Sequence, residues 1–393
     1  MKTMQRFQSA LHHLKEAGLY RRMRSMGSAS APRVNVDGRS LVMCAANNYL
    51  GLVDDDRLRE GAIDAIHRYG TGASGARLIT GTTDLHLHLE QALAELKQTE
   101  AAIVLNTGYM ANLAALSTLV GAGDVIFSDE LNHASIIDGC RLSKAAVVVY
   151  RHNDMDDLRH KLENYATTGQ RLIVTDGVFS MDGDVADLPA ITDLAQAYDA
   201  WVMVDDAHAT GVFGEHGGGT ADHYGLPADS IHIQVGTLSK ALACEGGFIA
   251  GSTVLIDYLR NRARPFIFST ALSPPVIGAA LRAVEIVSAE PQRRKRLHAL
   301  AQRLRKGLSE VGLQVIPGEA PIVPIVIGDP ERTLEYSRRL EHHGVFATAI
   351  RPPTVPPGTS RIRLTLMATH ADEDIEQIID ACTKAGKELG VIS

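Results

Sequence analysis

The most reactive candidate in the sequence is the side chain of Lys240, which stands between hydroxyl residues and small residues in "VGTLSKALACEGG" (235–247). Small neighbours let a bulky planar group approach the amine. A lysine that is partly removed from water has a lowered pKa and becomes a nucleophile for a carbonyl carbon, as in Schiff-base chemistry. The alternative for this stretch taken alone is a solvated surface lysine.

A second group of polar side chains follows an apolar run in "VMVDDAHATG" (202–211), which leads directly into Asp205, Asp206 and His208. A carboxylate at the tip of a buried strand can hold a cationic ring nitrogen, while the histidine three residues on contacts a neighbouring polar group. The same three residues could bind a metal, but no further ligand pair with suitable spacing lies nearby in the sequence. We therefore favour the ring-nitrogen interpretation, and a metal-dependent hydrolase is the alternative from a different class.

Three more stretches place polar or flexible residues where an apolar run gives way to a helix or a turn. Gly108 in "NTGYMAN" (106–112) should open a helix whose free backbone N–H groups can bind an anion, although a tight turn explains it equally well. His133 in "DELNHAS" (129–135) and Ser180 in "TDGVFSMDGD" (175–184) occupy similar places, with a structural histidine and ordinary turn chemistry as the alternatives.

Together these sites predict one ligand that carries an aldehyde, a phosphate and a protonatable ring nitrogen. Pyridoxal 5′-phosphate (PLP) has all three groups. Lys240 would form the Schiff base, Asp205 would keep the ring nitrogen protonated, and the turn at Gly108 with Thr237 would hold the phosphate.

The elements that must position these residues alternate between short apolar runs and stretches of helical period, which is the pattern of an α/β fold. We expect a large domain with a mostly parallel seven-stranded sheet, because most of the runs are apolar throughout and helix-sized stretches separate several of them. The last run follows its predecessor after few residues and is expected to be an antiparallel neighbour. The expected strands are 101–105, 124–128, 145–150, 171–176, 200–206, 231–236 and 246–251, and the clearest helices are 108–119, 154–165 and 187–198.

The sequence divides into three parts. Residues 1–50 are expected to form an N-terminal helix and strand segment, residues 51–284 the large cofactor-binding domain, and residues 285–393 a smaller C-terminal α+β domain. Alternating apolar residues predict three strands in the last part, at 320–328, 345–350 and 360–366.

Composition excludes several classes of function. With 393 residues, 45% of them hydrophobic, the chain can bury a large core, and its net charge of −7 argues against a general nucleic-acid binder. The four cysteines are widely spaced, which predicts neither a disulfide scaffold nor a cysteine-built zinc site and fits a reducing cytoplasm. We expect no membrane span, because no apolar run reaches the required length, and no signal peptide, because the first twenty residues alternate at helical spacing.

Five motifs give the chain a family resemblance. "NNYLGL", "NTGYMAN", "DDAHATG", "GTLSKA" and "RPPTVPPGTSRIRLTL" match, in order and across nearly the whole chain, the α-oxoamine synthases, which are fold-type I, aspartate-aminotransferase-like PLP enzymes. The last motif is most similar to members that join L-alanine to a pimeloyl thioester of coenzyme A or acyl carrier protein. Other members, such as glycine C-acetyltransferase, 5-aminolevulinate synthase and serine palmitoyltransferase, and a non-catalytic regulator with this fold, remain alternatives.

The resemblance implies roles for individual residues. Lys240 would be the Schiff-base lysine, Asp205 the partner of the ring nitrogen, and His208 the neighbour of the ring hydroxyl. His133 would stack on the ring and assist the acyl and decarboxylation steps. The resemblance also implies a homodimer with active sites at its interface. The remaining expected contacts are Gly108, Tyr109, Thr237 and, from the partner subunit, Thr270 for the phosphate; Ser180 beside the cofactor; Asn47 and Arg361 for the amino-acid carboxylate; Arg21 for the acyl substrate; and Thr354 for substrate.

A basic stretch, 292–306, carries seven lysines and arginines on an otherwise acidic protein. A solvated helix face is the simpler interpretation. The alternative is that Arg293, Arg296 and Arg303, helped by Arg21, Arg22 and Arg24, dock an acidic acyl carrier protein or the phosphates of coenzyme A.

Overall fold

A computed structural model describes residues 2–16, 19–21, 23–227 and 229–393. Its central feature is a seven-stranded sheet in the order β3-β9-β8-β7-β6-β4-β5. Strands β4 to β8 run parallel to one another, and β9 is antiparallel to both of its neighbours, so the predicted α/β sheet and its antiparallel member are confirmed. The strands are β3 (Ala101–Leu105), β4 (Val125–Asp129), β5 (Ala146–Tyr150), β6 (Arg171–Asp176), β7 (Ala200–Asp205), β8 (Ile233–Thr237) and β9 (Gly247–Gly251).

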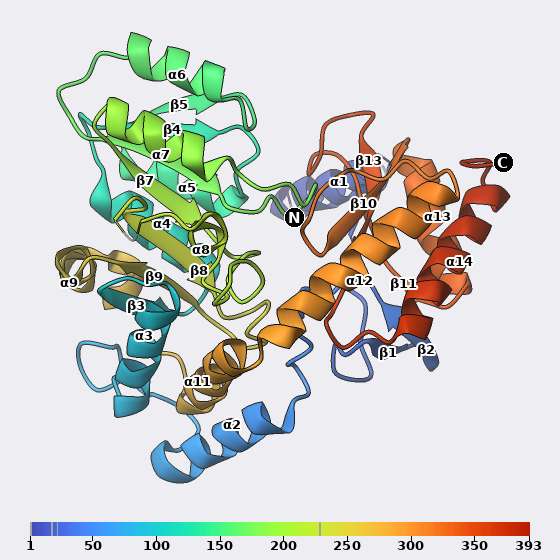
Figure 1. The fold of residues 1–393 in the computed structure, drawn as a ribbon, viewed down its shortest axis with the longest axis horizontal. Coiled ribbons are helices and arrows are strands. Elements are labelled where there is room, and N and C mark those ends of the chain that lie inside the picture. The colour runs from blue at the N-terminus through green and yellow to red at the C-terminus, as the bar shows by residue number, and fades with distance from the viewer. Residues whose placement is uncertain (1, 17–18, 22, 228) are drawn as a thin grey trace.

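Helices cover both faces of this sheet (Figure 1) because its strands present buried apolar side chains alternately to each face. Met203 of β7 packs in one core layer, whereas its neighbours Val202 and Val204 pack in the other. The first layer is closed by α4 (Gly108–Leu119), α5 (Ala134–Ser143), α9 (Thr253–Arg262) and α10 (Arg264–Ile267), and the second by α6 (Met155–Asn164) and α7 (Leu188–Ala197), with the short α8 (Thr220–Tyr224) beside them.

A further layer packs on the β3 and β9 side of the sheet. Phe248 and Ala250 of β9 face a core that includes α3 (Asp84–Leu96) and α11 (Pro274–Ala289). Helix α2 (Asp56–Tyr69) packs on α11 through a close glycine contact, since a Cβ on Gly61 would lie 2.7 Å from the carbonyl oxygen of Gly278.

The C-terminal part forms a second lobe, joined to the first by the long helix α12 (Pro291–Glu310) (Figure 1). Its antiparallel sheet has the order β10-β13-β12, with β10 (Ile322–Gly328), β12 (Thr348–Ile350) and β13 (Ser360–Thr365). Helices α13 (Pro330–His342) and α14 (Asp372–Glu388) complete this lobe.

The predicted strand at 345–350 is divided between two sheets. Residues Val345–Phe346 form β11, which pairs with β2 (Arg39–Met43) of the N-terminal segment, while β12 pairs with β13. Strand β2 also pairs with β1 (Arg33–Val36). The N-terminal strands therefore belong in space with the C-terminal lobe, although the division of the sequence at residues 50 and 284 remains a prediction.

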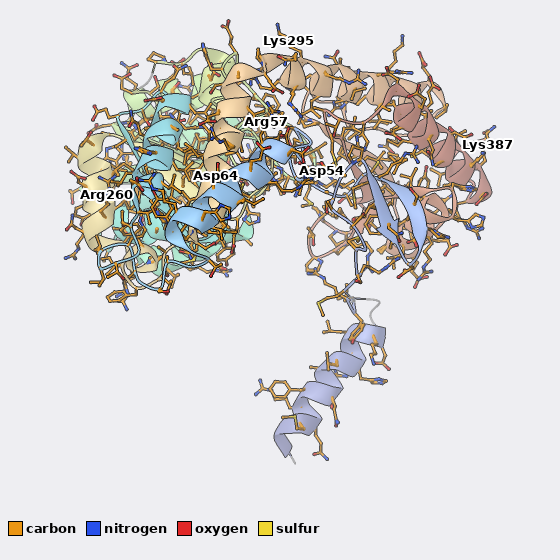
Figure 2. The ribbon with its side chains drawn as sticks, turned by 90° about the horizontal axis from the view of Figure 1, so that it is seen from below. Asp54, Arg57, Asp64, Arg260, Lys295 and Lys387 are labelled. Atoms are coloured by element: carbon orange, nitrogen blue, oxygen red, sulfur yellow. The ribbon has the colours of Figure 1, made fainter. Side chains whose placement is uncertain are left out.

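The first helix, α1 (Lys2–Glu16), projects away from both lobes (Figure 2). Its apolar side chains are exposed, from 41% for Leu14 to 64% for Met4. Across the described ranges, no helix combines the length and the apolar character that a membrane span requires.

Candidate active site

The candidate site lies where the parallel strands of the large sheet end. Because parallel strands end at the same edge, Asp176 of β6 and Asp205 of β7 are register partners, and β8 ends beside them just before Lys240. Both aspartates are buried.

Asp205 is held in place by hydrogen bonds to both of its carboxylate oxygens. Asn112 of α4 donates to Oδ2 over 2.6 Å, and the backbone N–H of Ala207 donates to Oδ1 over 2.9 Å. Asn112 also donates to the hydroxyl of Ser135 over 2.8 Å, so α4 and α5 share the support of this carboxylate. The carboxylate can therefore receive a protonated ring nitrogen without having to reorient.

Lys240 is half-buried and lies close to two carboxylates. Burial lowers the pKa of its amine, while the charges of Asp205 and Asp176 act in the opposite direction and that of Arg363 adds to the lowering. In the described part of the chain, its Nζ forms neither an ion pair nor a side-chain hydrogen bond. The structure thus gives Lys240 the features of a Schiff-base lysine: a tendency toward the neutral amine and no competing partner.

Two histidines flank the same space as neutral rings. Burial lowers the pKa of His133 despite the nearby charge of Asp205, and the ring Nδ1 lies 2.7 Å from the hydroxyl of Ser135. Burial, together with the charges of Lys240 and Arg363, holds the pKa of His208 well below its ordinary value. Each ring is therefore neutral near pH 7, with one nitrogen that donates a hydrogen bond and one that accepts.

Tyr49 is a member of the site that sequence reasoning missed. Its hydroxyl oxygen lies 2.6 Å from His208 Nδ1 and also donates to Asn47 Oδ1 over 3.3 Å. Burial raises the pKa of Tyr49 to about 12, so the phenol keeps its proton and fixes the orientation of the His208 ring. Tyr49 stands within the quoted "NNYLGL" motif, which was the available signal.

The residues expected to hold phosphate meet at the N-terminus of α4. A Cβ on Gly108 would lie 3.2 Å from the Cβ of Thr237, and a Cβ on Gly247 would lie 2.5 Å from the Gly108 nitrogen. Glycine therefore lets the helix start approach the end of β8 closely. The Thr237 hydroxyl lies 2.7 Å from that of Ser239, whereas Tyr109 is 41% exposed and donates its hydroxyl proton to Asp138.

The two arginines of β13 have different partners. Both point to the same face of the strand because they are two residues apart. Arg361 forms an ion pair with Asp182. Arg363 instead donates to the carbonyl oxygen of Ser180 over 2.5 Å and to Asn47 Oδ1 over 3.2 Å. The structure brings Arg363, rather than the predicted Arg361, next to Asn47. The acceptors of the Arg363 guanidinium named here are neutral oxygens, so they do not neutralise its positive charge.

Three predicted residues are exposed in the single chain. Arg21 is exposed beyond α1, and Thr354 is exposed in the loop before β13, where its N–H donates to the carbonyl oxygen of Arg351. Thr270 is also exposed, and its carbonyl oxygen accepts a hydrogen bond from Asn106 over 3.0 Å. Their assigned roles remain predictions.

Asp206 does not join Asp205 and His208 in a common site. Its carboxylate binds Lys97 Nζ over 2.6 Å and the hydroxyl of Thr220 over 2.6 Å. Among the residues described, no three histidine, cysteine or acidic side chains are grouped so that they could hold a metal ion. The Asp206 carboxylate is therefore committed to Lys97 and Thr220.

The arginines on the basic face of α12 form ion pairs with acidic residues of the same chain. Arg293 pairs with Glu290 and Asp55, and Arg303 binds Asp372 and Glu376, each over 2.9 Å. Arg296 lies 3.6 Å from Asp372. Of the N-terminal arginines, Arg24 pairs with Glu341 and Asp37, Arg21 is exposed, and Arg22 lies outside the described residues. These pairs hold α12 against α2 and α14, which favours an intramolecular role over docking.

Comparison with known proteins places the chain in a family. The model of aminotransferase class I and II matches residues 40–382. The chain belongs to the aminotransferase class I and II family. This aminotransferase-family protein is 50% identical, over 387 residues, to the 8-amino-7-oxononanoate synthase of Lysinibacillus sphaericus, which covers 98% of this chain and 99% of the relative.

Solved structures of the same class superpose on nearly the whole chain. The serine palmitoyltransferase of Sphingomonas wittichii has a TM-score of 0.94 and 32% identity and covers 98% of each chain. A structure described as SPT with a PLP internal aldimine also has a TM-score of 0.94, with 31% identity, and covers 100% of this chain and 99% of its own. The resemblance to the α-oxoamine synthases and the expected fold are confirmed.

Proposed function

We propose that this protein catalyses the PLP-dependent decarboxylative condensation of L-alanine with a pimeloyl thioester, giving 8-amino-7-oxononanoate, CO2 and a free thiol for biotin biosynthesis. The observation that carries the proposal is the 50% identity, over 98% of the chain, to a relative named 8-amino-7-oxononanoate synthase. Serine palmitoyltransferase is the second candidate because its solved structures share the whole fold, but at 31–32% identity they are more distant in sequence.

The residues at the strand ends fit PLP. A half-buried lysine, a fixed carboxylate and a glycine-opened helix start lie close together, and among the described residues neither the Lys240 amine nor the buried Oδ1 of Asn112 has a hydrogen-bond partner. Lys240, Asp205 and the Gly108–Thr237 corner would hold the aldehyde carbon, the ring nitrogen and the phosphate. When bound, PLP carries the amino acid through its nitrogen and withdraws electrons from the α-carbon.

The chain's own groups then divide the work of moving protons. Because burial lowers the pKa of Lys240, its amine can take the α-proton and later return a proton to the product. Asp205, fixed by Asn112, holds the proton on the ring nitrogen. His133, whose pKa is lowered by burial, would donate a proton to the acyl group or accept one from it.

Arg363 is our assignment for the carboxylate of the amino acid. Its guanidinium offers paired donors, and its present partners, Asn47 Oδ1 and the Ser180 carbonyl, leave its positive charge without a carboxylate. Arg361 already has Asp182 as a counter-charge. The acyl substrate would approach with help from Arg21 and Thr354.

We also propose a cytoplasmic homodimer with active sites at the subunit interface. Large apolar side chains are exposed near Thr270 in the sequence or fold, notably Ile79 at 80% and Phe268 at 70%, and the apolar side chains of α1 are exposed in the described structure. A second subunit would cover such surfaces. All four cysteines are free thiols, as a reducing compartment would keep them.

A turnover assay with purified protein tests the reaction. Alanine, glycine and serine should each be paired with pimeloyl, acetyl, succinyl and palmitoyl thioesters, with coenzyme A and acyl carrier protein compared as carriers. We expect the alanine and pimeloyl pair to give the highest kcat/KM. A preference for serine with palmitoyl thioester would replace the proposal with the second candidate.

A further inference from the structure

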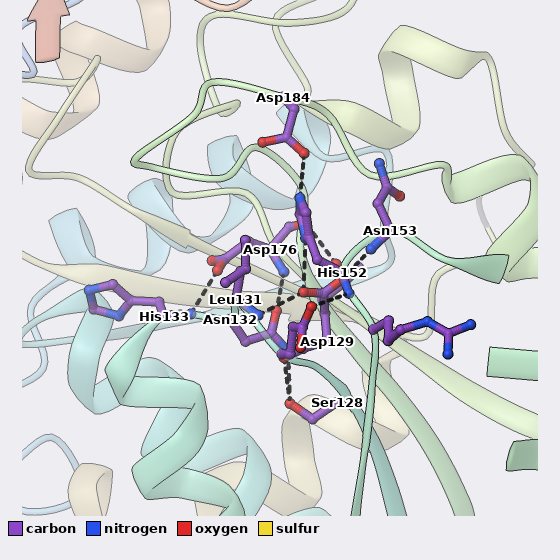
Figure 3. A network of polar contacts seen from close by, with 12 residues as sticks. Ser128, Asp129, Leu131, Asn132, His133, His152, Asn153, Asp176 and Asp184 are labelled. Carbon is purple, nitrogen blue, oxygen red and sulfur yellow. Dashed lines mark hydrogen bonds and ion pairs between the residues drawn. The ribbon is translucent and has the colours of Figure 1, made fainter. Parts of the chain in front are cut away.

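His152 lies between two carboxylates that belong to different segments of the large domain (Figure 3). Its Nδ1 is 3.0 Å from Asp129 Oδ1 at the end of β4, and its Nε2 is 2.8 Å from Asp184 Oδ2 in the loop after β6. The ring of Phe179 packs perpendicular to the imidazole, with centroids 4.4 Å apart. One ring thus connects two segments that are more than fifty residues apart in the sequence.

This geometry requires a charged ring. An ionised carboxylate only accepts hydrogen bonds, so both imidazole nitrogens must carry a proton to satisfy both contacts. Burial of the ring opposes the charge, but the hydrogen bonds and charges of Asp129 and Asp184 outweigh it and raise the pKa of His152 to about 10. The other charged neighbours are engaged elsewhere: Glu130 accepts the His152 backbone N–H, and Arg151 pairs with Asp154 and Asp157.

Asp129 organises the turn that leads to His133. Its carboxylate accepts the backbone N–H groups of Leu131 over 2.8 Å and Asn153 over 2.9 Å. At the far end of the same turn, the His133 N–H donates to Asp176 over 2.7 Å (Figure 3). The position of His133 therefore depends on both ends of this turn.

Asp184 belongs to a hairpin, residues 177–186, that faces the small domain. The hairpin is closed by the bridge between Val178 and Val185. Ser180 offers its carbonyl to Arg363, and Asp182 pairs with Arg361. At Gly183, whose φ is 74°, a Cβ would lie 2.8 Å from the carbonyl oxygen of Ile322 in β10. The hairpin is therefore the surface on which both arginines of β13 rest.

Asp184 depends strongly on His152. Its Oδ1 is buried and has no hydrogen-bond partner in the described structure. The contact from Oδ2 to His152 is therefore the main interaction that offsets the loss of water around this carboxylate. Loss of the imidazolium would leave a partly buried carboxylate uncompensated, which is costly. The hairpin should then shift or open.

We propose that His152 is a positioning residue: as a cation bridging Asp129 and Asp184, it fixes the 177–186 hairpin relative to His133 and so sets the place of Arg363. The first half of this inference is independent of the reaction. The second half rests on the proposed function, which assigns the amino-acid carboxylate to Arg363.

Two measurements on the full-length protein test the first half without using activity. In histidine-labelled protein, the His152 ring, assigned by its loss in His152→Asn, should be doubly protonated at pH 8, where an ordinary histidine with a pKa near 6.5 is neutral. In His152→Ala, amide hydrogen exchange in residues 177–186 should accelerate about tenfold or more. The control is His160→Ala, which alters an exposed histidine on α6 that contacts Asn164. A neutral ring at pH 8, or unchanged exchange in the hairpin, would overturn the proposal.

Kinetics test the second half. His152→Ala should raise the KM for alanine about tenfold while the KM for the pimeloyl thioester stays within about twofold, because Arg363 would lose its support. His152→Arg should recover part of the loss, since a guanidinium can donate to two carboxylates. Equal changes in both KM values would contradict a specific effect on Arg363.

Two results separate this inference from the proposed function. If the wild-type protein makes no 8-amino-7-oxononanoate but the exchange and protonation results hold, the proposed function fails and the bridge stands. If His152→Ala does not fold, Asp184→Asn removes the charge of one partner and keeps its shape, and it should show the same direction of change in hairpin exchange. Wild-type exchange in that variant would count against the proposal.

Discussion

Two lysines, one buried and one half-buried, lie near neighbouring aspartates at the end of β7, and their surroundings are opposite. Lys97 is fully buried and binds Asp206 Oδ2 over 2.6 Å, with the carbonyl oxygen of Gly218 as a second acceptor. Lys240 is close to Asp205 but has no ion pair in the part of the chain described, and burial lowers the pKa of its amine. A lysine with a counter-charge is kept as a fixed cation, whereas a desolvated lysine without one is available for chemistry.

The same contrast separates the two arginines of β13. Arg361 is neutralised by Asp182, while Arg363 donates to the neutral oxygens of Ser180 and Asn47. In both pairs, the group that lacks a carboxylate partner is the one that faces the proposed cofactor and substrate. Substitutions at these lysines, at their aspartate partners and at the two arginines should therefore have different consequences.

Replacement of Lys240 should have the largest effect on catalysis. Lys240→Ala should lower kcat at least about 10⁴-fold, because it removes both the nucleophile and the group that moves the α-proton. The melting temperature should stay close to that of the wild type, since no ion pair is lost. Turnover assays and thermal unfolding measure the two quantities, and a variant with wild-type kcat would refute the assignment.

Asp205 should follow in size. Asp205→Asn should slow the exchange of the alanine α-proton for deuterium by about 10²–10⁴-fold, because a neutral amide cannot stabilise a proton on the ring nitrogen. NMR of the alanine α-hydrogen measures this rate. The matched control is Asp206→Asn, which should leave the exchange rate within a few-fold of wild type because Asp206 faces Lys97 instead. If both variants slowed the exchange of the α-proton equally, Asp205 would have no special role beside the ring nitrogen.

Lys97 should affect stability instead of chemistry. Lys97→Met should lower the free energy of unfolding by about 3–5 kcal/mol, because it leaves the Asp206 carboxylate buried and unpaired. The double variant Lys97→Met, Asp206→Asn should recover part of this loss. Urea unfolding measures both values. A large fall in kcat for the folded Lys97→Met protein would show that the two lysines are not separated in function.

The β13 arginines should give the smallest difference. Arg363→Lys should raise the KM for alanine about tenfold, since lysine cannot form the paired contacts that a guanidinium makes with a carboxylate. Arg361→Lys should change that KM by less than about twofold and can still pair with Asp182. Steady-state kinetics at varied alanine concentration measure both KM values. A larger rise in KM for Arg361→Lys than for Arg363→Lys would assign the amino-acid carboxylate to Arg361.

Much of the sheet and of the site around Lys240 could be predicted because the information is local. The apolar runs of β6, β7 and β8 mark buried strands, and the polar residues that follow them must meet at one edge once the strands are parallel. Asp205, His208 and Lys240 were found in this way. Asp176 ends its strand in the same manner as Asp205, and the same rule applied to β6 would have found it.

Pairings between distant segments could not be read from any local pattern. Arg361 and Arg363 have the same position in the alternation of β13, and only the packing of the 177–186 hairpin gives one of them Asp182 and the other the Ser180 carbonyl. The pattern of "VFATAI" predicts one continuous strand, yet its first residues pair with β2 and its last ones pair with β13.

Runs of contiguous residues specify the α/β architecture and the chemical types gathered at the strand ends, because apolar periodicity is a property of neighbouring residues. Which charged groups have a counter-charge depends on how distant segments pack together. Lys97 meets Asp206 across more than a hundred residues, and His152 bridges Asp129 and Asp184 from three separate segments. Whether a charged side chain is available to a ligand depends on whether an opposite charge lies within a few ångströms of it in space. The number of residues between two charges in the sequence does not give that distance.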